Sequence, residues 1–514
     1  MLGPHSQRLR RFAVITALGL AATALPLGMM NGPQAQAAPR LPIAKADCGP
    51  GSSPERGLQG DVPAADRNSG RSKRGYSCNV KRLGAYQGHG AGITSTSYQN
   101  CAYMGSLFPG AAIGSDTGVS VVDASNPRAP QRTAVLDHPA LQAGTWESLK
   151  VNRNSGLLVG AGVPFLTGAG LLAVYDVAKD CAHPTLMNDV VGTPAAPLAI
   201  TAHEGGFSPD GKTYWATGTA PGVISAVSLD DPKHPRVLLN NLTALDNHGI
   251  GVSPDGNTLY LSHNFGGISI WDISSIQKRS ANPRMVKLAD LGWSNGVLTQ
   301  HSIPVTYGNK DYLFTVLEGG SGGVKFIDVN NPRKPKVVNE LKLEINLPKH
   351  QDSALASSMG GSAFAYESHY CAADRPVNPT ALACGWISSG IRVFDVRDPF
   401  DVKEIAYYNP PAQTGKHLEL WNSPHALASV IGLPLISTTG ILQSLASGQF
   451  DPRQAISARS GNLVGDLSTD WCFSPPEWRG NQLYVGCSDN GFQVLQLTND
   501  VYTPPTDQLS TVGS

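Results

Sequence analysis

The stretch GVKFIDVNNPRKP, residues 323–335, decides the fold because the chain repeats it. Each copy has a glycine, four to six residues of largely apolar character, usually an aspartate, and often an Asn-Pro or Asp-Pro turn. Tandem copies of one strand-forming phrase predict a repeat architecture. The seven copies begin at Gly118, Gly170, Gly222, Gly267, Gly323, Gly390 and Gly491.

The spacing of these glycines indicates the type of repeat. Successive gaps are 52, 52, 45, 56, 67 and 101 residues, and a four-stranded propeller blade takes about 40–50 residues. The fourth unit shows all four expected strands, and Pro254 and Gly256 suit a type I turn between its first two strands. We therefore expect an all-β, seven-bladed β-propeller with insertions in the two long gaps. The four strands of the fourth unit fall within residues 248–256, 257–264, 267–274 and 283–291.

A ring of blades has to close, because an open edge strand exposes unpaired backbone groups. Residues 501–514, which follow the last copy, form a short tail with two prolines and leave little room for a fourth strand. Residues 78–87 have strand character and lie just before blade one. We therefore predict a propeller over residues 78–500 whose N-terminal strand closes blade seven. The insertions are expected at about 343–366 and 410–466, the second of them partly helical and placed before blade seven.

The repeated phrase resembles that of the bacterial LVIVD-repeat propellers. The match is to short runs ending in aspartate, and looser copies extend it over about residues 78–500. The resemblance implies a secreted or surface propeller and says little about activity, because fold does not determine function. The closest runs are Val119–Asp123, Ile268–Asp272, Val324–Asp328 and Ile391–Asp395.

The N-terminus has the pattern of a secretory signal over residues 1–37. Arginines at 8, 10 and 11 precede an apolar run from Phe12 to Leu27, and Ala35-Gln36-Ala37 suits cleavage. The run is shorter than a membrane span of ~20 residues, so we expect a secreted or extracytoplasmic protein with no transmembrane anchor after cleavage. General secretion and twin-arginine export both stay open. Residues 38–77 are polar and aperiodic, which predicts a flexible N-terminal arm.

Charge and cysteine content narrow the functional classes. Cleavage would leave 36 basic against 39 acidic residues, without a basic patch, which argues against nucleic-acid binding. Eight cysteines in an exported chain predict disulfides. We expect Cys371 to pair with Cys384 and Cys472 with Cys487. The remaining four, Cys48, Cys78, Cys101 and Cys181, can pair in three ways, and we favour Cys48 with Cys78 because that bond would tether the arm.

A second repeat emerges when the blades are aligned on their first strands. Histidine or glutamate opens most of these strands, and in a propeller the first strands line the central channel. Equivalent side chains should therefore form a ring near one mouth. Imidazole and carboxylate groups are ligands of zinc, copper and iron, so the ring is a candidate metal site. Its members are His89, Glu147, His203, His248, His301 and His369, and Thr469 takes the position in blade seven.

The alternative is that these histidines are structural, since blade duplication also copies residues that have no function. The insertions bear on this choice, because both should emerge on the face of the ring and could form a lid. His417, Glu419 and His425 in one insertion, and His350 and Met359 in the other, are therefore additional candidates.

The sequence thus supports two hypotheses of different classes. The first is a metal-dependent enzyme, an oxidoreductase or a hydrolase acting on a small molecule, with copper, iron or zinc in the ring. The second is an extracellular binding or scaffold propeller with a protein or cell-wall partner and a structural ring. A Gly-x-Ser-x-Gly match at residues 319–323 does not support a serine nucleophile, because no helix pattern follows it.

Overall fold

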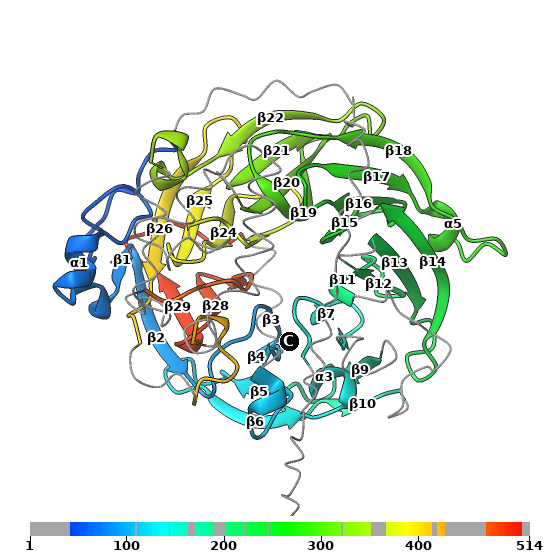
Figure 1. Ribbon diagram of the computed structural model, residues 1–514, viewed down its shortest axis with the longest axis horizontal. Helices are drawn as coiled ribbons and strands as arrows, with labels where there is room; N and C mark the ends of the chain where they lie inside the picture. Colours follow the sequence, from blue (N-terminus) through cyan, green and yellow to red (C-terminus); the bar gives the residue numbers. More distant parts are fainter. Residues whose placement is uncertain are drawn as a thin grey trace, which may run out of the picture. The chain divides into compact units, whose positions relative to one another are not determined.

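A computed structural model shows seven small antiparallel sheets arranged in a ring, which confirms the seven-bladed β-propeller (Figure 1). The sheets belong to one compact unit. The predicted signal, residues 1–37, lies outside the described residues. The structure describes residues 42–107, 110–142, 144–162, 171–188, 202–218, 222–244, 246–319, 322–350, 366–413, 419–426 and 469–505.

Each of the first three blades has four consecutive strands in the order of the chain, with the first strand nearest the channel. Blade one consists of β3 (Ser95–Tyr98), β4 (Cys101–Met104), β5 (Val119–Asp123) and β6 (Gln131–Leu136). Blade two consists of β7 (Lys150–Asn152), β8 (Leu157–Ala161), β9 (Leu172–Asp176) and β10 (Thr185–Leu186). Blade three consists of β11 (Ala202–Phe207), β12 (Thr213–Gly218), β13 (Gly222–Ser228) and β14 (Arg236–Ala244).

Blades four to six continue the same pattern. Blade four consists of β15 (Ile250–Val252), β16 (Thr258–Ser262), β17 (Ile268–Asp272) and β18 (Val286–Leu291). Blade five consists of β19 (Val297–Tyr307), β20 (Lys310–Gly319), β21 (Val324–Asp328) and β22 (Lys336–Leu341). Blade six consists of β23 (Tyr370–Ala373), β24 (Ala381–Gly385), β25 (Ile391–Asp395) and β26 (Lys403–Asn409).

Blade seven is closed by the N-terminal strand, as expected. Its strands β27 (Glu477–Arg479), β28 (Gln482–Cys487) and β29 (Gly491–Leu497) are completed by β2 (Val80–Tyr86), which pairs antiparallel with β29. The preceding strand, β1 (Tyr76–Cys78), adds a fifth strand to blade six by pairing with β26. Two successive segments of the N-terminal chain therefore join the outer edges of the last two blades.

The repeated phrase is the third strand of each blade, and its apolar character follows from burial on both faces. In β17, Ile270 packs in the cluster shared with blade five, whereas Trp271 packs in the cluster shared with blade three. In β21, Phe326 and Ile327 divide in the same way between blades six and four. A strand buried on both faces reads as a short continuous apolar run, and the core is a set of layers between neighbouring blades.

The glycine and the aspartate of the phrase also have local physical reasons. Gly390 has a φ of +76°, and a Cβ placed there would lie 2.4 Å from the carbonyl oxygen of Tyr408 on the outer strand. At the other end of the strand, the Asp395 Oδ1 accepts the backbone N–H of Arg397 at 3.0 Å. Asp123 makes the equivalent turn with Ser125 at 2.8 Å. The phrase therefore encodes a strand with a tight entry and a side-chain-capped exit.

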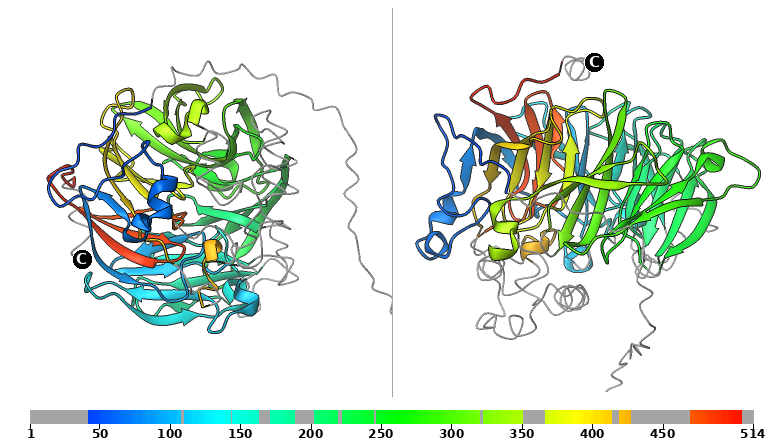
Figure 2. Two further views of the ribbon diagram at one scale, coloured as in Figure 1. Left: turned by 60° about the vertical axis from the view of Figure 1, so that its left-hand side comes forward. Right: turned by 90° about the horizontal axis from the view of Figure 1, so that it is seen from above.

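The expected flexible arm, residues 38–77, is instead packed over its described part, residues 42–77. It contains α1 (Ala64–Asn68) and the 3-10 helix η1 (Arg71–Arg74), which lie beside blade six (Figures 1 and 2). Val62 and Tyr76 are buried, and the side chain of Glu55 pairs with the buried Arg392 at 2.7 Å. The polar composition misled here because the segment is held by ion pairs and hydrogen bonds to blade six, by a disulfide, and by a small apolar cluster in which Val62 and Tyr76 pack with Tyr407 of that blade.

All eight cysteines form disulfides, and the three expected pairs are present. Cys48 bonds Cys78 and thereby fastens the N-terminal segment at β1, and the fourth bond joins Cys101 to Cys181. Thiolate metal ligands are therefore excluded. The pattern fits an oxidising, extracytoplasmic compartment.

The remaining described helices are short. They are α2 (Gly110–Ile113), α3 (Pro139–Gln142), α5 (Ser274–Gln277), and the 3-10 helices η2 (Glu344–Asn346) and η3 (Pro348–His350). None of the described helices is long and apolar enough to span a membrane. The helices expected in the insertion 410–466 fall almost wholly on residues 427–468, outside the part of the chain that the structure describes, as does Met359.

Candidate metal centre

The first strands of blades two, three, four and six bring four of the expected ring residues together. His203 lies in β11. His369 directly precedes β23, His248 lies two residues before β15, and Glu147 lies three residues before β7. A backbone hydrogen bond from the Glu147 N–H to the His203 carbonyl, 3.1 Å, aligns blade two with blade three at this level. The same level of the channel therefore receives side chains from four blades.

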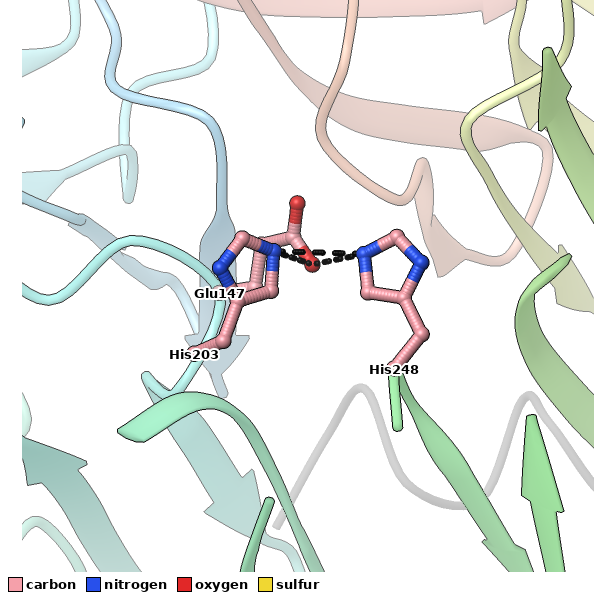
Figure 3. A group of neighbouring side chains, drawn as sticks. All are labelled: Glu147, His203 and His248. Atoms are coloured by element: carbon pink, nitrogen blue, oxygen red, sulfur yellow. Dashed lines mark hydrogen bonds and ion pairs between the residues drawn. The ribbon is translucent and has the colours of Figure 1, made fainter. Parts of the chain in front are cut away.

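Three imidazoles and two carboxylates converge in this cluster. Glu147 Oε2 lies 3.4 Å from His203 Nε2 and 3.6 Å from His248 Nε2, and Figure 3 shows the two imidazoles facing each other across this carboxylate. Glu147 Oε1 lies 3.2 Å from His369 Nε2. The fifth member, Glu318 at the end of β20, lies 3.6 Å from both His248 Nε2 and His369 Nε2. The cluster is Glu147, His203, His248, Glu318 and His369.

These separations match the geometry of a metal coordination shell. Zinc and similar ions bind nitrogen and oxygen at about 2.0–2.2 Å, so neighbouring ligand atoms of a tetrahedral shell lie ~3.3–3.6 Å apart. The five distances from carboxylate oxygen to imidazole nitrogen in the cluster run from 3.2 to 3.6 Å. The ligand atoms of Glu147, His203 and His248 form one candidate group, and those of Glu147, Glu318 and His369 form a second. The shared Glu147 joins them into one site.

Neighbouring groups orient the cluster as second-sphere residues do in metal sites. The Nδ1 of His369 lies 3.1 Å from the Phe473 carbonyl oxygen, an arrangement in which Nδ1 carries the proton and Nε2 presents its lone pair to the cluster. Gln300 Nε2 donates to Glu147 Oε2 at 2.7 Å, and the Tyr370 hydroxyl donates to the same oxygen at 3.2 Å. Glu147 is therefore held in position by two neutral donors.

The electrostatics of the cluster favour bound positive charge. Burial raises the pKa of Glu147, but His203, with His248 and His369, holds it well below its usual range. Burial lowers the pKa of His369, yet Glu318 and Glu147 raise it to about 10. The pKa of His203 is also raised, because Glu147 outweighs the effect of burial. A metal ion would therefore bind here in competition with protons.

Two of the expected ring residues lie outside the cluster. His301 faces away because β19 has a bulge between Thr299 and Ser302, which places Gln300 at the cluster level instead. The His301 ring stacks on Tyr370 at 4.6 Å between centroids, and burial and Lys150 lower its pKa to about 3. His89 precedes β3 by six residues and lies at the rim, where its Nδ1 is 3.1 Å from the Glu419 carbonyl oxygen.

The sequence did not reveal Glu318, Gln300 and Tyr370. Glu318 comes from the second strand of its blade, so an alignment of first strands could not include it. Gln300 is displaced by the bulge, which leaves no trace in the strand pattern. Tyr370 directly follows His369, and that adjacency was the one available signal.

A second acidic and histidine group occurs among the described residues. His425, Asp470 and Asp489 are buried and have ligand atoms within 4.8 Å of one another. Asp489 pairs with His425 at 2.8 Å and accepts the Ser423 hydroxyl at 2.6 Å. Asp470 accepts backbone N–H groups from Trp471 and Asp489. Because protein donors satisfy these carboxylates, the group serves to anchor residues 419–426 to blade seven.

The other candidates from the insertions are not drawn into the cluster. Glu419 contributes its backbone carbonyl to His89, and His350 lies 4.0 Å from Glu344. His417 lies outside the described residues.

A cavity of about 410 Å³ lies along the first strands of blades three to six, one level beyond the cluster. Its lining includes the residues that follow His203 along β11, His248 along β15, Gln300 along β19 and His369 along β23. Tyr370 lines the cavity and also donates to Glu147 Oε2. The side chain of Tyr370 therefore lies between the cavity and the cluster.

Comparisons with known proteins assign neither a family nor an activity to this chain. No protein-family model matches the chain, so the likeness to LVIVD-repeat propellers stays a sequence resemblance, and no curated protein matches it in sequence. Among solved structures, the periplasmic gluconolactonase of Pseudomonas aeruginosa matches at 13% identity and a TM-score of 0.42, over 60% of this chain and 82% of that one. A putative 6-phosphogluconolactonase of Bacteroides uniformis matches at 13% identity and a TM-score of 0.41, over 60% and 82%. Similarity of this size says nothing about activity.

Proposed function

We propose that this protein is an exported, metal-dependent enzyme that acts on a small molecule. A transition metal, copper, iron or zinc, would be held by Glu147, His203, His248, Glu318 and His369. The observation that supports this most strongly is the convergence of three Nε2 atoms and two carboxylates at separations of 3.2 to 3.6 Å. Imidazole with carboxylate is a ligand set for divalent first-row metals.

The ion would supply electrophilic activation, either of water for hydrolysis or of a substrate for oxidation. The chain's own groups then have defined tasks. His203 has a side chain that is 20% exposed, against 1 to 6% for the other four members, so solvent reaches the cluster on that side. On the other side, the Tyr370 hydroxyl lies between Glu147 and the cavity and orients the carboxylate by donating to Glu147 Oε2. The identity of the ion would decide between hydrolase and oxidoreductase.

A binding or scaffold propeller is the second candidate, and one observation favours it. His248 Nε2 lies 3.2 Å from His203 Nε2, within hydrogen-bonding distance. Protonated imidazoles would balance the negative charge of the two carboxylates without a metal ion. The cluster would then hold the blades together by ion pairs and hydrogen bonds across the channel. Such a protein would present its outer faces to an extracellular protein or a cell-wall component.

Metal analysis of the exported, untagged protein separates these candidates. We expect near-stoichiometric metal in the wild type, and at least a tenfold loss of metal affinity in His248→Ala and His369→Ala, because each removes an imidazole ligand. The matched control is His263→Ala in blade four, a buried histidine whose ring bonds the Asp246 carbonyl and the Ser269 hydroxyl. It should retain wild-type metal content. A folded wild type that takes up no copper, iron or zinc after reconstitution contradicts the enzyme and leaves the scaffold.

A further inference from the structure

We propose that the channel cavity binds a small organic anion, a carboxylic acid with an apolar body, and that Lys150 holds the carboxylate. The cavity volume of about 410 Å³ lies within the usual range for small-molecule sites, ~300–1,000 Å³. As a binding site, the cavity stands independently of the metal. As the substrate site of the enzyme, it rests on the function proposed above.

Lys150 is the group that selects an anion. Its ammonium lies 4.5 Å from the centre of the Tyr370 ring and 3.7 Å from Glu204 Oε1, and the second distance exceeds a hydrogen bond. Within the described residues, its three N–H donors make no hydrogen bond. A carboxylate in the cavity would accept these donors in charge-assisted hydrogen bonds, which are stronger than neutral ones.

Two further buried polar atoms at the same end of the cavity have no hydrogen-bond partner among the described residues. They are Glu204 Oε2 and His301 Nδ1, on side chains that are 2% and 7% exposed. A buried polar atom without a hydrogen-bond partner destabilises the folded state, so natural proteins retain few of them. Both residues line the cavity. Of these two groups, only the imidazole of His301 can donate to a ligand carboxylate, so Lys150 and His301 favour an anion and the Glu204 carboxylate does not.

The rest of the lining defines the body of the ligand. Phe207, Ile250 and Ile303 supply apolar walls, and Arg375 is a second basic residue. The lining thus carries two basic side chains against one acidic side chain, Glu204. This balance favours an anion, and the apolar walls favour a carbon skeleton over a bare inorganic ion.

The first experiment needs no variant. Isothermal titration of the full-length exported protein would compare 2-naphthoate with its neutral isostere, 2-naphthamide. We expect 2-naphthoate to bind at least about tenfold more tightly, because only the carboxylate engages the ammonium. Equal affinities, or no binding of either probe, would overturn the proposal.

The second experiment assigns the selectivity to Lys150. Lys150→Gln should weaken 2-naphthoate at least about tenfold and leave 2-naphthamide within about twofold, and Lys150→Arg should retain most of the preference. The matched control is Lys287→Gln, because Lys287 also carries one ion pair, to Asp290, and a cation–π contact, to Trp271, but lies on the outer strand β18. It should not change binding. Unchanged selectivity in a folded Lys150→Gln variant would assign the anion to another site.

Repeating the titrations after chelation separates the two proposals. Binding that depends on Lys150 and persists in metal-free protein supports the cavity whatever the cluster holds. If the wild type takes up no metal but still prefers 2-naphthoate, the enzyme proposal fails and the anion site stands. Binding that requires metal and ignores Lys150 would place the carboxylate on the metal and overturn the cavity proposal.

Discussion

Replacing Arg392 by methionine tests how the N-terminal segment is held. The Arg392 side chain is fully buried in blade six, and its guanidinium bonds Glu404 Oε1 at 3.0 Å and Glu55 Oε2 at 2.7 Å. Glu404 Oε2 in turn accepts Gln59 Nε2 at 2.8 Å. One guanidinium therefore connects the blade to the segment of residues 42–77 through the buried carboxylate of Glu404 and the partly buried carboxylate of Glu55.

The expected cost follows from what the substitution leaves behind. Methionine keeps much of the side-chain volume but provides no donor, so Glu404 stays buried without its positive partner. Burial already raises the pKa of Glu404, with Arg392 acting against that rise. Removing one member of a buried ion pair costs about 3–5 kcal/mol. We expect Arg392→Met to lower the free energy of unfolding by about that amount.

Arg397→Met is a matched control on the same blade. Arg397 also pairs with a carboxylate, Asp395, but its side chain is 72% exposed. Exposed ion pairs contribute about 0.2–1 kcal/mol, so this variant should stay close to the wild type. The free energies would be compared by urea unfolding with the disulfides intact.

Limited trypsin digestion gives a second readout. The segment contains Arg56, Arg67 and Lys73, and cleavage at these sites should accelerate in Arg392→Met and not in Arg397→Met. The Cys48–Cys78 bond retains the fragment until reduction, which makes the cut visible by mass. Equal stability and equal protease resistance of the two variants would refute the reasoning, because the buried ion network would then contribute no more than a surface pair.

Three further predictions address the channel and the closure of the ring. Burial and Lys150 lower the pKa of His301 to about 3, so the native state resists protonation of this imidazole and loses stability as pH falls from about 6.5. Urea unfolding between pH 6 and 4 should therefore show that the free energy of unfolding falls less steeply with pH in His301→Gln than in the wild type, by up to about 1.4 kcal/mol per pH unit. Equal pH slopes of the two proteins would contradict this. A Cβ on Gly249 would lie 2.3 Å from the backbone carbonyl oxygen of Gln300, whereas one on Gly292 would have no atom within 4 Å. Gly249→Ala should therefore weaken metal uptake at least about tenfold by displacing the backbone next to His248, and Gly292→Ala should leave metal uptake unchanged. Asn79, between β1 and β2, has a φ of +55° and four side-chain hydrogen bonds. Asn79→Gly loses the hydrogen bonds but tolerates the positive φ, and it should lower the free energy of unfolding by about 2–4 kcal/mol; Asn79→Ala adds backbone strain and should lower it by about 1–2 kcal/mol more. Wild-type stability of both variants would show that the stability of the fold does not depend on this junction.

The sequence could predict the blades because their signals are local. The glycine, the apolar run and the aspartate of each copy have roles within a few residues, as the Gly390 entry and the Asp395 turn show. The same holds for the disulfide between Cys371 and Cys384 on neighbouring strands. The sequence also predicted closure by the N-terminal strand, because blade seven lacked an outer strand and residues 78–87 had strand character but no blade of their own.

The N-terminal segment was predicted wrongly because its order is not local. Its apolar residues are too few to predict a core, and much of its packing is against residues more than 300 positions away, including Arg392 and Tyr407. No pattern within residues 38–77 records those partners.

By itself, the sequence determined the number of blades, the closing strand and the level of the channel at which Glu147, His203, His248 and His369 meet, because these depend on strand periodicity and on equivalent positions in a repeat. Only the tertiary structure decided that His301 is rotated out by a bulge, that Glu318 enters from a second strand, and that a cavity with Lys150 lies beneath the cluster. These features depend on the register between strands and on the distances between blades, which are set by packing across the ring and leave no periodic trace in the chain.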